Sequence, residues 1–382
     1  MKFMHLSDLH LGKRLIGWPR IEEQRTVLQE ILDIAKAEKP NAVLIAGDIY
    51  DRPVPSEEAT GLLNSFLVSL CEMNIPVLMI SGNHDSSERL SFAASLLDQS
   101  HIHISPTYHG PVKRIILSDG LGPVAFHLLP FIRPGDVRRA WPEEAESIVT
   151  YTDAVACAIR HMELLPDGRN VLLAHQYVLG AERCDSEEIT IGGLDEVMPS
   201  VFEPFDYTAL GHIHGPQNVT RDGRVRYCGT PLQYSVSERH HHKSVTMVEL
   251  GKPGETRVTT IPLHMPRPVI RISGSFIDLM NGTVDGLIPD AYIDFILTDE
   301  HETPDAVAQL RRLYPWTLGI RYENARTRAL EQDFQPQSET PSVGPLEVIR
   351  SLYQLQNGTD PDEQQQAYLS DLLRTLREEA VL

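Results

Sequence analysis

Short, continuously apolar runs in the first 211 residues each end in a polar turn that carries glycine, histidine or aspartate. Continuous apolarity over four or five residues predicts strands that are buried on both faces. The five runs are 3–6, 42–46, 76–80, 170–174 and 207–210. Apolar residues at helical spacing within 23–37 and 57–73 predict helices between the first strands. This alternation is typical of an α/β fold whose parallel strands end at one edge of a sheet, so we expect a functional site there.

The pattern of the second half predicts a boundary followed by a smaller domain. Strands expected at 245–250 and 256–261 complete the first layer, and Pro262, Pro266 and Pro268 then mark a boundary. Beyond the prolines the order strand, strand, helix, strand predicts a small α+β domain. These elements are 269–272, 291–295, 303–313 and 317–322. The expected division of the chain is 1–265, 266–330 and 331–382.

The last part, 331–382, is predicted to be a linker followed by two helices. Residues 335–345 are rich in Pro, Ser and Gln, which is typical of a tether. Asp360 as N-cap and Pro361 at the first helical position predict the start of the second helix. The expected apolar stripe is Val348, Ile349, Leu352, Leu355, Leu369, Leu372, Leu373 and Leu376. The stripe packs either on the chain's own second domain or on a partner protein, and the tether favours a partner.

Composition and charge exclude some classes of protein. No apolar run approaches the roughly 20 residues of a membrane helix, and the N-terminus lacks a signal peptide, so a cytoplasmic protein without a membrane partner is expected. The net charge of −19 argues against a protein that coats nucleic acid through a broad basic face. That charge does not exclude phosphate binding, because bound cations can reverse the local field.

The cysteines and one run of histidines have ordinary structural explanations. The four cysteines lie far apart with no C-x-x-C pair, so reduced thiols are expected and zinc held by thiolates is not. They are Cys71, Cys157, Cys184 and Cys228. The run 240–242 of three histidines is expected to be an exposed loop, since adjacent side chains cannot all converge on one ion.

The turns after the five strands supply carboxylate, carboxamide and imidazole groups without a thiolate. They carry Asp8, His10, Asp48, Asn83, His84, Asp85, His175, His212 and His214. Such a set suits divalent metals such as manganese, iron or zinc. Two metals about 4 Å apart need a bridging ligand, and a carboxylate such as that of Asp48 can offer one oxygen to each. Each fragment alone is a weak signal, but the ordered set predicts a two-metal hydrolase.

The ordered set resembles the calcineurin-like metallophosphoesterase superfamily over residues 1 to about 230. The resemblance implies a β-sandwich flanked by helices, here with a small α+β capping domain and a C-terminal helical tail. It also implies that one metal binds Asp8, His10, Asp48 and His214. The other metal would bind Asp48, Asn83, His175 and His212. Manganese is the expected ion.

Further motifs resemble the SbcD family, the nuclease subunits of bacterial SbcCD complexes. They are Gly82–Ser86 with Arg89–Leu90, and the stretches 174–178, 192–195, 205–207, 227–231 and 243–245. The resemblance implies a nuclease of DNA repair, recombination and replication, exonucleolytic (3′–5′) on double-stranded ends and endonucleolytic on hairpins and single strands. It implies a coiled-coil ATPase partner like SbcC, a homodimer within a heterotetramer and a nucleoid-associated location. Where relatives often carry an assisting histidine, this chain has Tyr50-Asp51-Arg52.

Two further residues are expected to act in catalysis beside the ligands. His84 follows Asn83, so its side chain is placed to stabilise the transition state or to protonate the leaving 3′-oxygen. Asp85 either orients His84 or caps the following helix.

Basic residues near the ligand turns have two interpretations. Arg52 and Arg89, and likewise Lys13 and Arg14, contact the DNA backbone or form surface salt bridges.

Other functions remain open from the sequence. A phosphatase or a cyclic-nucleotide phosphodiesterase would use the same metals, and the acidic charge favours a small substrate. The extra domain and tail argue against that, since a small substrate needs neither. A non-catalytic scaffold is disfavoured because every ligand position is filled.

Overall fold

The structure is a computed structural model that describes residues 1–185, 187, 195–324, 327, 345–357, 359–362, 364–370 and 372. Its contacts divide the chain into two compact units. The first comprises Met1–Glu188 and Asp195–Glu323, and the second comprises Ile189–Leu194 and Asn324–Leu382. The boundary expected at residue 265 falls inside the first unit, and the three-domain division stays a prediction.

Two six-stranded sheets form the centre of the first unit. The strand order of the first sheet is β14-β13-β1-β4-β5-β6. Strands β1, β4, β5 and β6 run parallel, and β13 and β14 add antiparallel pairs at the other edge. The bounds are β1 Lys2–Leu6, β4 Ala42–Ala46, β5 Val77–Ile80, β6 Ile102–Ile104, β13 Ser244–Leu250 and β14 Thr256–Pro262.

The second sheet has the order β11-β12-β10-β9-β8-β7. Its central strands β12, β10, β9 and β8 are parallel, and each outer strand pairs antiparallel with its neighbour. The bounds are β7 Lys113–Asp119, β8 Gly122–Leu128, β9 Arg169–His175, β10 Tyr207–Gly211, β11 Gln217–Asn218 and β12 Val225–Tyr227.

The two sheets pack face to face through alternate residues of their strands. Phe3 and Leu44 of the first sheet share one buried cluster with Phe126 and Val171 of the second. The rings of Phe3 and Phe126 meet edge to face at 5.6 Å. The intervening residues, such as Met4, point the other way into a second cluster beneath helices. Burial on both faces explains why these strands are continuously apolar in the sequence.

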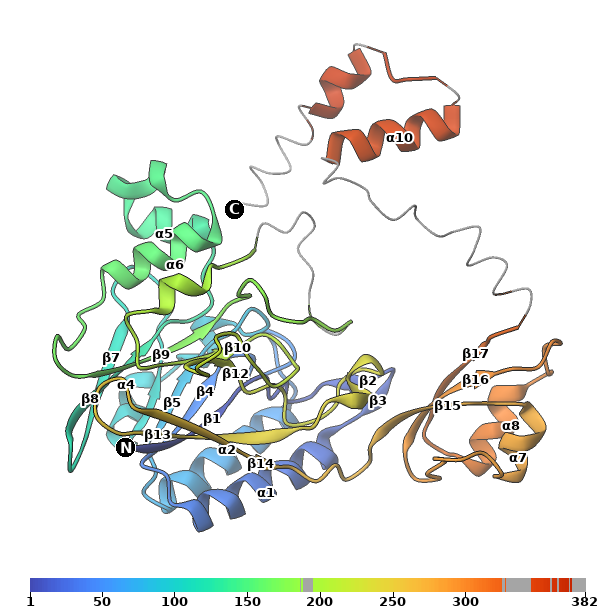
Figure 1. The fold of residues 1–382 in the computed structure, drawn as a ribbon, viewed down its shortest axis with the longest axis horizontal. Coiled ribbons are helices and arrows are strands. Elements are labelled where there is room, and N and C mark those ends of the chain that lie inside the picture. The colour runs from blue at the N-terminus through green and yellow to red at the C-terminus, as the bar shows by residue number, and fades with distance from the viewer. Residues whose placement is uncertain are drawn as a thin grey trace. The chain divides into compact units, whose positions relative to one another are not determined.

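Helices cover the outer faces of both sheets, as Figure 1 shows. Helices α1 (Ile21–Glu38) and α2 (Glu57–Glu72) pack on the first sheet, and α5 (Pro134–Ala140) and α6 (Tyr151–Arg160) pack on the second. The Ser56 hydroxyl caps α2 by accepting a hydrogen bond from the Ala59 N–H. The expected sandwich flanked by helices is therefore confirmed.

Short elements connect these layers. They are β2 Arg14–Leu15, β3 Trp18–Pro19, α3 Ser87–Leu90, α4 Ala94–Leu97, η1 Asp98–Ser100, η2 Pro142–Ser147, η3 Pro199–Phe202 and η4 Ser237–His240, where η marks a 3₁₀ helix.

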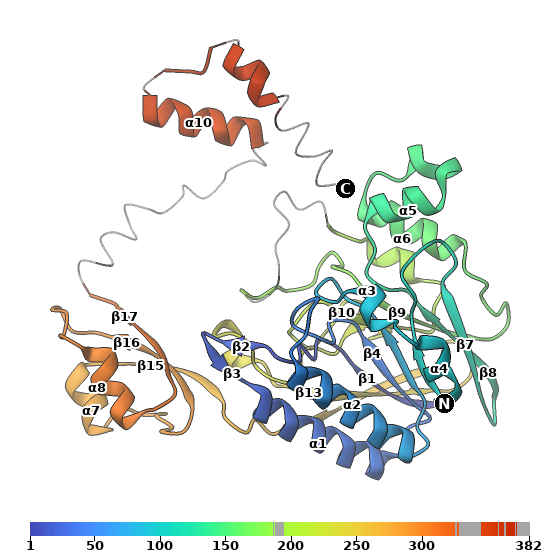
Figure 2. The same cartoon turned by 180° about the vertical axis from the view of Figure 1, so that it is seen from behind.

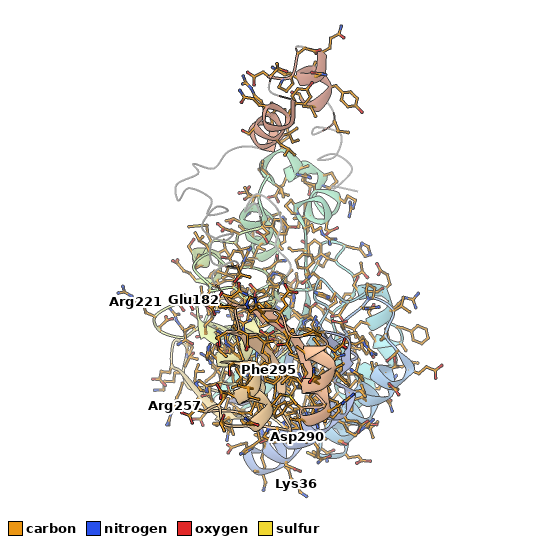
Figure 3. All side chains as sticks on the ribbon, turned by 90° about the vertical axis from the view of Figure 1, so that its right-hand side faces the viewer. Lys36, Glu182, Arg221, Arg257, Asp290 and Phe295 are labelled. Atoms are coloured by element: carbon orange, nitrogen blue, oxygen red, sulfur yellow. The ribbon has the colours of Figure 1, made fainter. Side chains whose placement is uncertain are left out.

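A three-stranded parallel sheet, β15-β16-β17, follows the prolines. Its elements are β15 Val269–Gly274, α7 Phe276–Asn281, β16 Tyr292–Leu297, α8 Ala306–Leu313 and β17 Thr317–Tyr322. Phe295, which Figure 3 labels, is fully buried in the core of this small domain. Tyr292 packs with Leu15 and Val269, and its hydroxyl lies 2.9 Å from Glu23 Oε1 of α1. These contacts explain why the small domain belongs to the first unit.

The described part of the second unit contains α10 (Pro345–Asn357) and a further helical turn at 364–370. Asp362 caps this later helix, since its carboxylate and Gln365 exchange hydrogen bonds of 2.9 Å with each other's backbone N–H. The prediction of Asp360 as N-cap is therefore wrong by two residues, and Asp360 instead pairs with Arg350 at 2.9 Å.

Parts of the predicted tail lie outside what the structure describes. Most of the linker 335–345 does so, as do Leu373, Leu376, the side chains of Val348 and Leu355, and the motif 192–194. Leu352 and Leu372 are exposed. In the described part of the chain, no helix has the length and apolarity to cross a membrane.

The strands predicted from the sequence are confirmed within one or two residues. Sequence pattern assigned no element between 86 and 168, where the structure has the β7–β8 hairpin and helices α5 and α6. Strand β7 alternates half-buried and exposed residues because it lies at the edge of its sheet, so it lacks the continuous apolarity that marks the central strands. Helix α7 was also missed, because six residues are too short for a helical period to stand out.

Candidate metal centre

The predicted ligands lie at the carboxyl ends of parallel strands from both sheets. Asp8 and His10 follow β1, Asp48 follows β4, and Asn83 follows β5. His175 is the last residue of β9, and His212 and His214 follow β10. Leu6 pairs with Ile45, and His175 pairs with Gly211, so neighbouring strands end at the same level. The two sheets thus bring their polar turns to one edge.

Four of these residues have a backbone conformation that L-amino acids rarely adopt. The φ angles are +52° at Asp8, +42° at His10, +48° at Asp48 and +104° at His212. Such conformations cost about 1–3 kcal/mol each and persist where the surrounding structure imposes them. Four such conformations in one site indicate that these turns serve to orient the ligand side chains, at a cost in stability.

Glycines allow the turns to approach each other. A Cβ atom at Gly82 would lie 2.1 Å from Asp48 Oδ1, and one at Gly211 would lie 2.0 Å from the Ala46 carbonyl oxygen. A Cβ atom at Gly47 would lie 2.4 Å from His175 Nδ1. Any side chain at these positions would push the ligand turns apart, which explains the G-D, G-N and G-H pairs in the sequence.

Asp48 lies at the centre of the group. Its Oδ2 atom is 3.4 Å from His175 Nε2 and 3.6 Å from His10 Nε2. On one side, Asn83 Oδ1 lies 3.0 Å from both His175 Nε2 and His212 Nδ1. On the other side, His10 Nε2 lies 3.2 Å from His214 Nε2.

Asp8 adjoins the same centre from the end of β1. The backbone N–H of His212 donates to its two carboxylate oxygens at 3.0 and 3.2 Å, and the Ser7 hydroxyl donates to it as well. The triads Asp8, His10, His214 and Asp8, Asp48, His175 each place three ligand atoms within 4.8 Å of one another. The first triad belongs to one predicted ligand set, whereas the second takes residues from both sets and places Asp48 between them.

The hydrogen bonds behind two of the imidazoles direct their Nε2 atoms toward the centre. His175 Nδ1 lies 2.8 Å from the Ala46 carbonyl oxygen, which can only accept, so this nitrogen carries the proton. His214 Nδ1 lies 3.0 Å from Glu238 Oε1, and the same reasoning applies. The Nε2 atoms of His175 and His214 therefore face Asn83 Oδ1 at 3.0 Å and His10 Nε2 at 3.2 Å, so a proton or a cation must lie between the atoms of each pair. Converging lone pairs repel unless a cation lies among them, so these residues fit a bound divalent metal.

The protonation of the group agrees with that fit. Burial holds the pKa of His10 well below its ordinary value and lowers the pKa of His212 to about 3. Both imidazoles are therefore neutral and can act as ligands at neutral pH. Burial opposes the charge of Asp48, yet the nearby His175 imidazole holds the pKa of Asp48 well below its usual range. Although burial disfavours imidazolium, the Asp48 carboxylate raises the pKa of His175 to about 9, so without a cation His175 Nε2 carries a proton. A divalent metal would take the place of that proton between the two side chains.

His84 and Asp85 lie beside the centre in different roles. The backbone N–H of His84 donates to Asp48 Oδ1 at 2.9 Å, its Nδ1 lies 3.1 Å from the Asp51 carbonyl oxygen, and its Nε2 lies 3.9 Å from Asp48 Oδ2. The Asp85 carboxylate accepts from the backbone N–H groups of Ile49, Tyr50 and Gly82 at 2.9–3.1 Å. Asp85 thus ties two ligand turns together. The following helix α3 is capped by Ser86 instead.

A buried ion pair behind His214 was not found from the sequence. Glu238 and Lys243 are both buried, with Lys243 Nζ 2.5 Å from Glu238 Oε2 and 2.5 Å from Thr230 Oγ1. Lys243 also donates to the His214 carbonyl at 3.0 Å. Thr230 and Lys243 lie in stretches that carry the SbcD resemblance, but nothing in the sequence indicated what they do. Glu238 had no such signal.

The basic residues proposed to contact DNA are at the surface. The Arg52 side chain is 78% exposed and its Nε lies 3.7 Å from Asp51 Oδ2. Arg89 is exposed on α3. Lys13 donates to Asp51 at 2.8 Å, and Arg14 donates to the Gly17 carbonyl. Arg52 and Arg89 are accessible to a substrate, whereas Lys13 and Arg14 have partners within the chain.

The cysteines and the histidine run agree in part with expectation. All four cysteines are free thiols, so the expectation of reduced thiols is confirmed. His240 and His242 are exposed, whereas His241 is half-buried.

Comparison with known proteins agrees with the geometry. Residues 1–216 match the family described as calcineurin-like phosphoesterase, and residues 265–357 match the type 5 capsule protein repressor C-terminal domain, which is also the C-terminal domain of SbcD. A solved dimetal phosphatase from Danio rerio shares 13% identity, with 69% of this chain and 96% of that chain covered and a TM-score of 0.40. Another solved structure shares 10% identity at a TM-score of 0.37, with coverage of 69% and 99%. At these TM-scores neither structure supports an argument.

The match to the calcineurin-like phosphoesterase family covers more than half of this chain, so the chain belongs to that family. This family is one of metal-dependent hydrolases that use divalent ions. The phosphoesterase domain followed by the second matched domain fits one member of the family in particular. That member is SbcD.

Proposed function

We propose that this chain is a metal-dependent DNA nuclease, with 3′–5′ exonuclease activity on double-stranded ends and endonuclease activity on hairpins and single strands. It would serve DNA repair, recombination and replication as the nuclease subunit of an ATPase–nuclease complex in the cytoplasm, near the nucleoid. The observation that carries the proposal is the convergence of six other ligand side chains around Asp48, in a chain whose two matched regions fit SbcD.

The metals are proposed to be two manganese ions. Asp8, His10, Asp48 and His214 would hold one, and Asp48, Asn83, His175 and His212 would hold the other. When bound, such a pair lowers the pKa of a water to near neutrality and neutralises charge on the phosphoryl oxygens. The chain itself orients the ligands, since the Ala46 carbonyl and Glu238 fix which imidazole nitrogen faces the centre.

His84 is proposed to contact the substrate. Its Nδ1 donates to the Asp51 carbonyl, which directs Nε2 toward the side of Asp48 where the phosphodiester would bind. From there a protonated His84 can donate a hydrogen bond to the phosphoryl group and a proton to the leaving 3′-oxygen. Asp85 is proposed to support this step as a positioning residue, because its carboxylate joins the backbone of the Asp48 turn to that of the Asn83 turn.

The remaining assignments concern the substrate and the partner. Arg52 and Arg89 are proposed to contact phosphates of double-stranded ends or hairpins without reading sequence. The tail is proposed to bind a coiled-coil ATPase like SbcC, in a heterotetramer built on a homodimer of this chain. The match of residues 265–357 to the SbcD C-terminal domain supports this context.

A phosphatase or cyclic-nucleotide phosphodiesterase is the alternative, because it would use the same ligands. The net charge of −19 favours a small substrate over a long polyanion. The second matched domain argues against it, since a small ester needs no such addition.

The deciding experiment is an assay of the purified full chain with manganese. Linear duplex DNA, a DNA hairpin and a nitrophenyl phosphodiester are offered in turn. Degradation of DNA supports the nuclease, whereas hydrolysis of the nitrophenyl ester alone supports the alternative. If DNA is intact, the assay is repeated with the ATPase subunit, and intact DNA there as well contradicts the nuclease.

Two variants control that assay. Asp48→Asn removes the charge of the bridging ligand and should abolish hydrolysis of every substrate. Asp33→Asn makes the same chemical change on the exposed face of α1 and should leave all rates unaltered.

A further inference from the structure

A cleft of about 810 Å³ begins at the metal centre and extends from the Asn83 turn to helix α5. Its near end is the Ser81–Asp85 turn, which carries the ligand Asn83. Its far wall is helix α5, and Figure 2 shows α3, which also lines the cleft, below α5. The volume lies within the range of about 300–1,000 Å³ that is typical of ligand pockets.

The segment before α5 fixes an aromatic ring between the metal centre and the cleft. The Phe131 backbone N–H donates to the Ser81 carbonyl at 2.9 Å, which ties this segment to the ligand turn. The Phe131 ring lies nearly perpendicular to the ring of the predicted ligand His175, with centroids 6.3 Å apart at 81°. The half-buried Phe131 ring also lines the cleft. An aromatic face thus lies next to the site of the chemistry.

Arg133 places a positive charge beside this ring. Its guanidinium lies 5.2 Å from the Phe131 ring centroid, and its side chain is exposed to the cleft. The nearby Asp136 does not neutralise it, because that carboxylate accepts from the Arg133 backbone N–H at 2.8 Å and pairs with Arg139 at 2.6 Å. Within the described residues, no carboxylate forms an ion pair with the Arg133 guanidinium.

We infer that this cleft is a nucleotide subsite, which binds the nucleotide next to the scissile phosphodiester of a DNA strand. Phe131 contacts the base, since bases of any sequence stack on an aromatic ring, and Arg133 binds the adjacent phosphate. Tyr108 and His109 also line the cleft, and the Tyr108 hydroxyl accepts a hydrogen bond from Trp141 at the end of α5. The subsite rests on the proposed nuclease function and deepens it by giving the strand a path away from the metals.

The charge of the whole chain makes such a subsite necessary. A protein of net charge −19 repels DNA over most of its surface, so a strand needs local cations and stacking surfaces near the metals. The Phe131 ring and the Arg133 guanidinium, which forms no ion pair in the described residues, both line the same cleft as Asn83 and supply the two interactions that a strand offers at every nucleotide. Neither interaction reads sequence, which suits an enzyme that degrades any DNA end.

The test measures the affinity of the full chain for a fluorescent single-stranded oligonucleotide in EDTA, by anisotropy, so that no cleavage occurs. Arg133→Ala should weaken binding about tenfold, and the slope of log Kd against log salt concentration should fall by about one. Arg133→Lys should restore much of the salt slope. Phe131→Leu should weaken binding to the intact strand but not to a strand of abasic nucleotides, which offers no base to stack.

The matched control is Arg114→Ala, because Arg114 is an arginine on β7 that pairs with Glu163 at the surface. Its affinity should equal that of the unaltered protein. Unchanged affinity in Arg133→Ala and Phe131→Leu overturns the subsite, as does a loss in Arg133→Ala that is matched by weaker Mn²⁺ binding in a separate titration. Failure of the nuclease proposal is a different result, namely intact DNA in the manganese assay while the binding differences persist.

Discussion

Glu238 Oε1 lies 3.0 Å from His214 Nδ1, and both side chains are buried. This carboxylate fixes the tautomer and the ring orientation of a predicted metal ligand. The carboxylate is itself neutralised by Lys243, whose Nζ lies 2.5 Å from the other oxygen. Burial opposes ionisation of Glu238. The Lys243 ammonium nevertheless holds the pKa of Glu238 far below its ordinary value, so the carboxylate stays charged.

Glu238→Ala should lower the affinity for Mn²⁺ about 10- to 100-fold, the usual effect of losing a group that orients a metal-binding histidine. It should also destabilise the protein by about 3–5 kcal/mol, because Lys243 is left buried without a counter-charge. Calorimetric Mn²⁺ titration and denaturant unfolding measure the two effects separately.

The double variant Glu238→Ala with Lys243→Met separates metal binding from stability. Removing both charges should recover most of the stability, because no unpaired charge stays buried, while the Mn²⁺ affinity stays low. Recovered affinity in the double variant would show that Glu238 acts on folding alone.

His84→Ala should reduce DNA cleavage about 10²- to 10⁴-fold, the range expected for loss of a general acid. Mn²⁺ affinity and stoichiometry should stay as in the unaltered protein, because the seven predicted ligands do not include His84. The prediction is a sharp one, since His84 lies close enough to His10 and Asp48 to form with them a group that could hold a metal ion. Rates and metal titration on the same preparation provide the check. Loss of one metal together with activity would make His84 a ligand instead.

The sequence predicted the centre of the fold because buried parallel strands impose continuous apolar runs. Ala42–Ala46 is buried at every position, and its pattern could be assigned to a strand without other information. Strand β7 carries half-buried and exposed residues in alternation, so its edge position became apparent only in three dimensions.

The candidate site could be predicted as a set of residues but not as a geometry. Asp8, Asp48 and His175 are far apart in sequence, and only the common edge of two sheets brings them within 4.8 Å. The residues that support these ligands could not be predicted. Glu238 and Lys243 are charged residues of a short connecting segment, and nothing in the sequence shows that folding buries them as a pair. The role of Asp85 was likewise ambiguous, because its partners are backbone groups, which leave no trace in the sequence.

Truncation after Glu347 should leave nitrophenyl ester hydrolysis unaltered and abolish association with the coiled-coil ATPase. The deletion removes most of α10 and belongs to the second compact unit, whereas all predicted ligands belong to the first. Size-exclusion chromatography of the mixed subunits and the ester assay provide the two measurements. Association that survives the deletion would assign the tail to packing within this chain.

Asp119→Asn should destabilise the protein by about 1–3 kcal/mol at neutral pH, the cost of leaving a buried donor without its acceptor. Asp119 accepts hydrogen bonds of 3.0 and 2.6 Å from both terminal nitrogens of the buried Arg169, and the other acceptors of Arg169 are backbone carbonyls. The hydrogen bonds from Arg169 hold the pKa of Asp119 below the ordinary value of 3.8.

The sign of the pH dependence follows from that depressed pKa. The contribution of the Asp119 carboxylate is fully present above the unfolded-state pKa of about 4 and is lost as the pH falls toward the lower folded-state value. The difference in unfolding free energy between the unaltered protein and Asp119→Asn should therefore be constant from pH 8 to about pH 5 and shrink below about pH 4. Urea unfolding at several pH values measures it. A difference that is the same at low pH and at neutral pH would show that the charge of Asp119 contributes nothing and that the asparagine acts through packing alone.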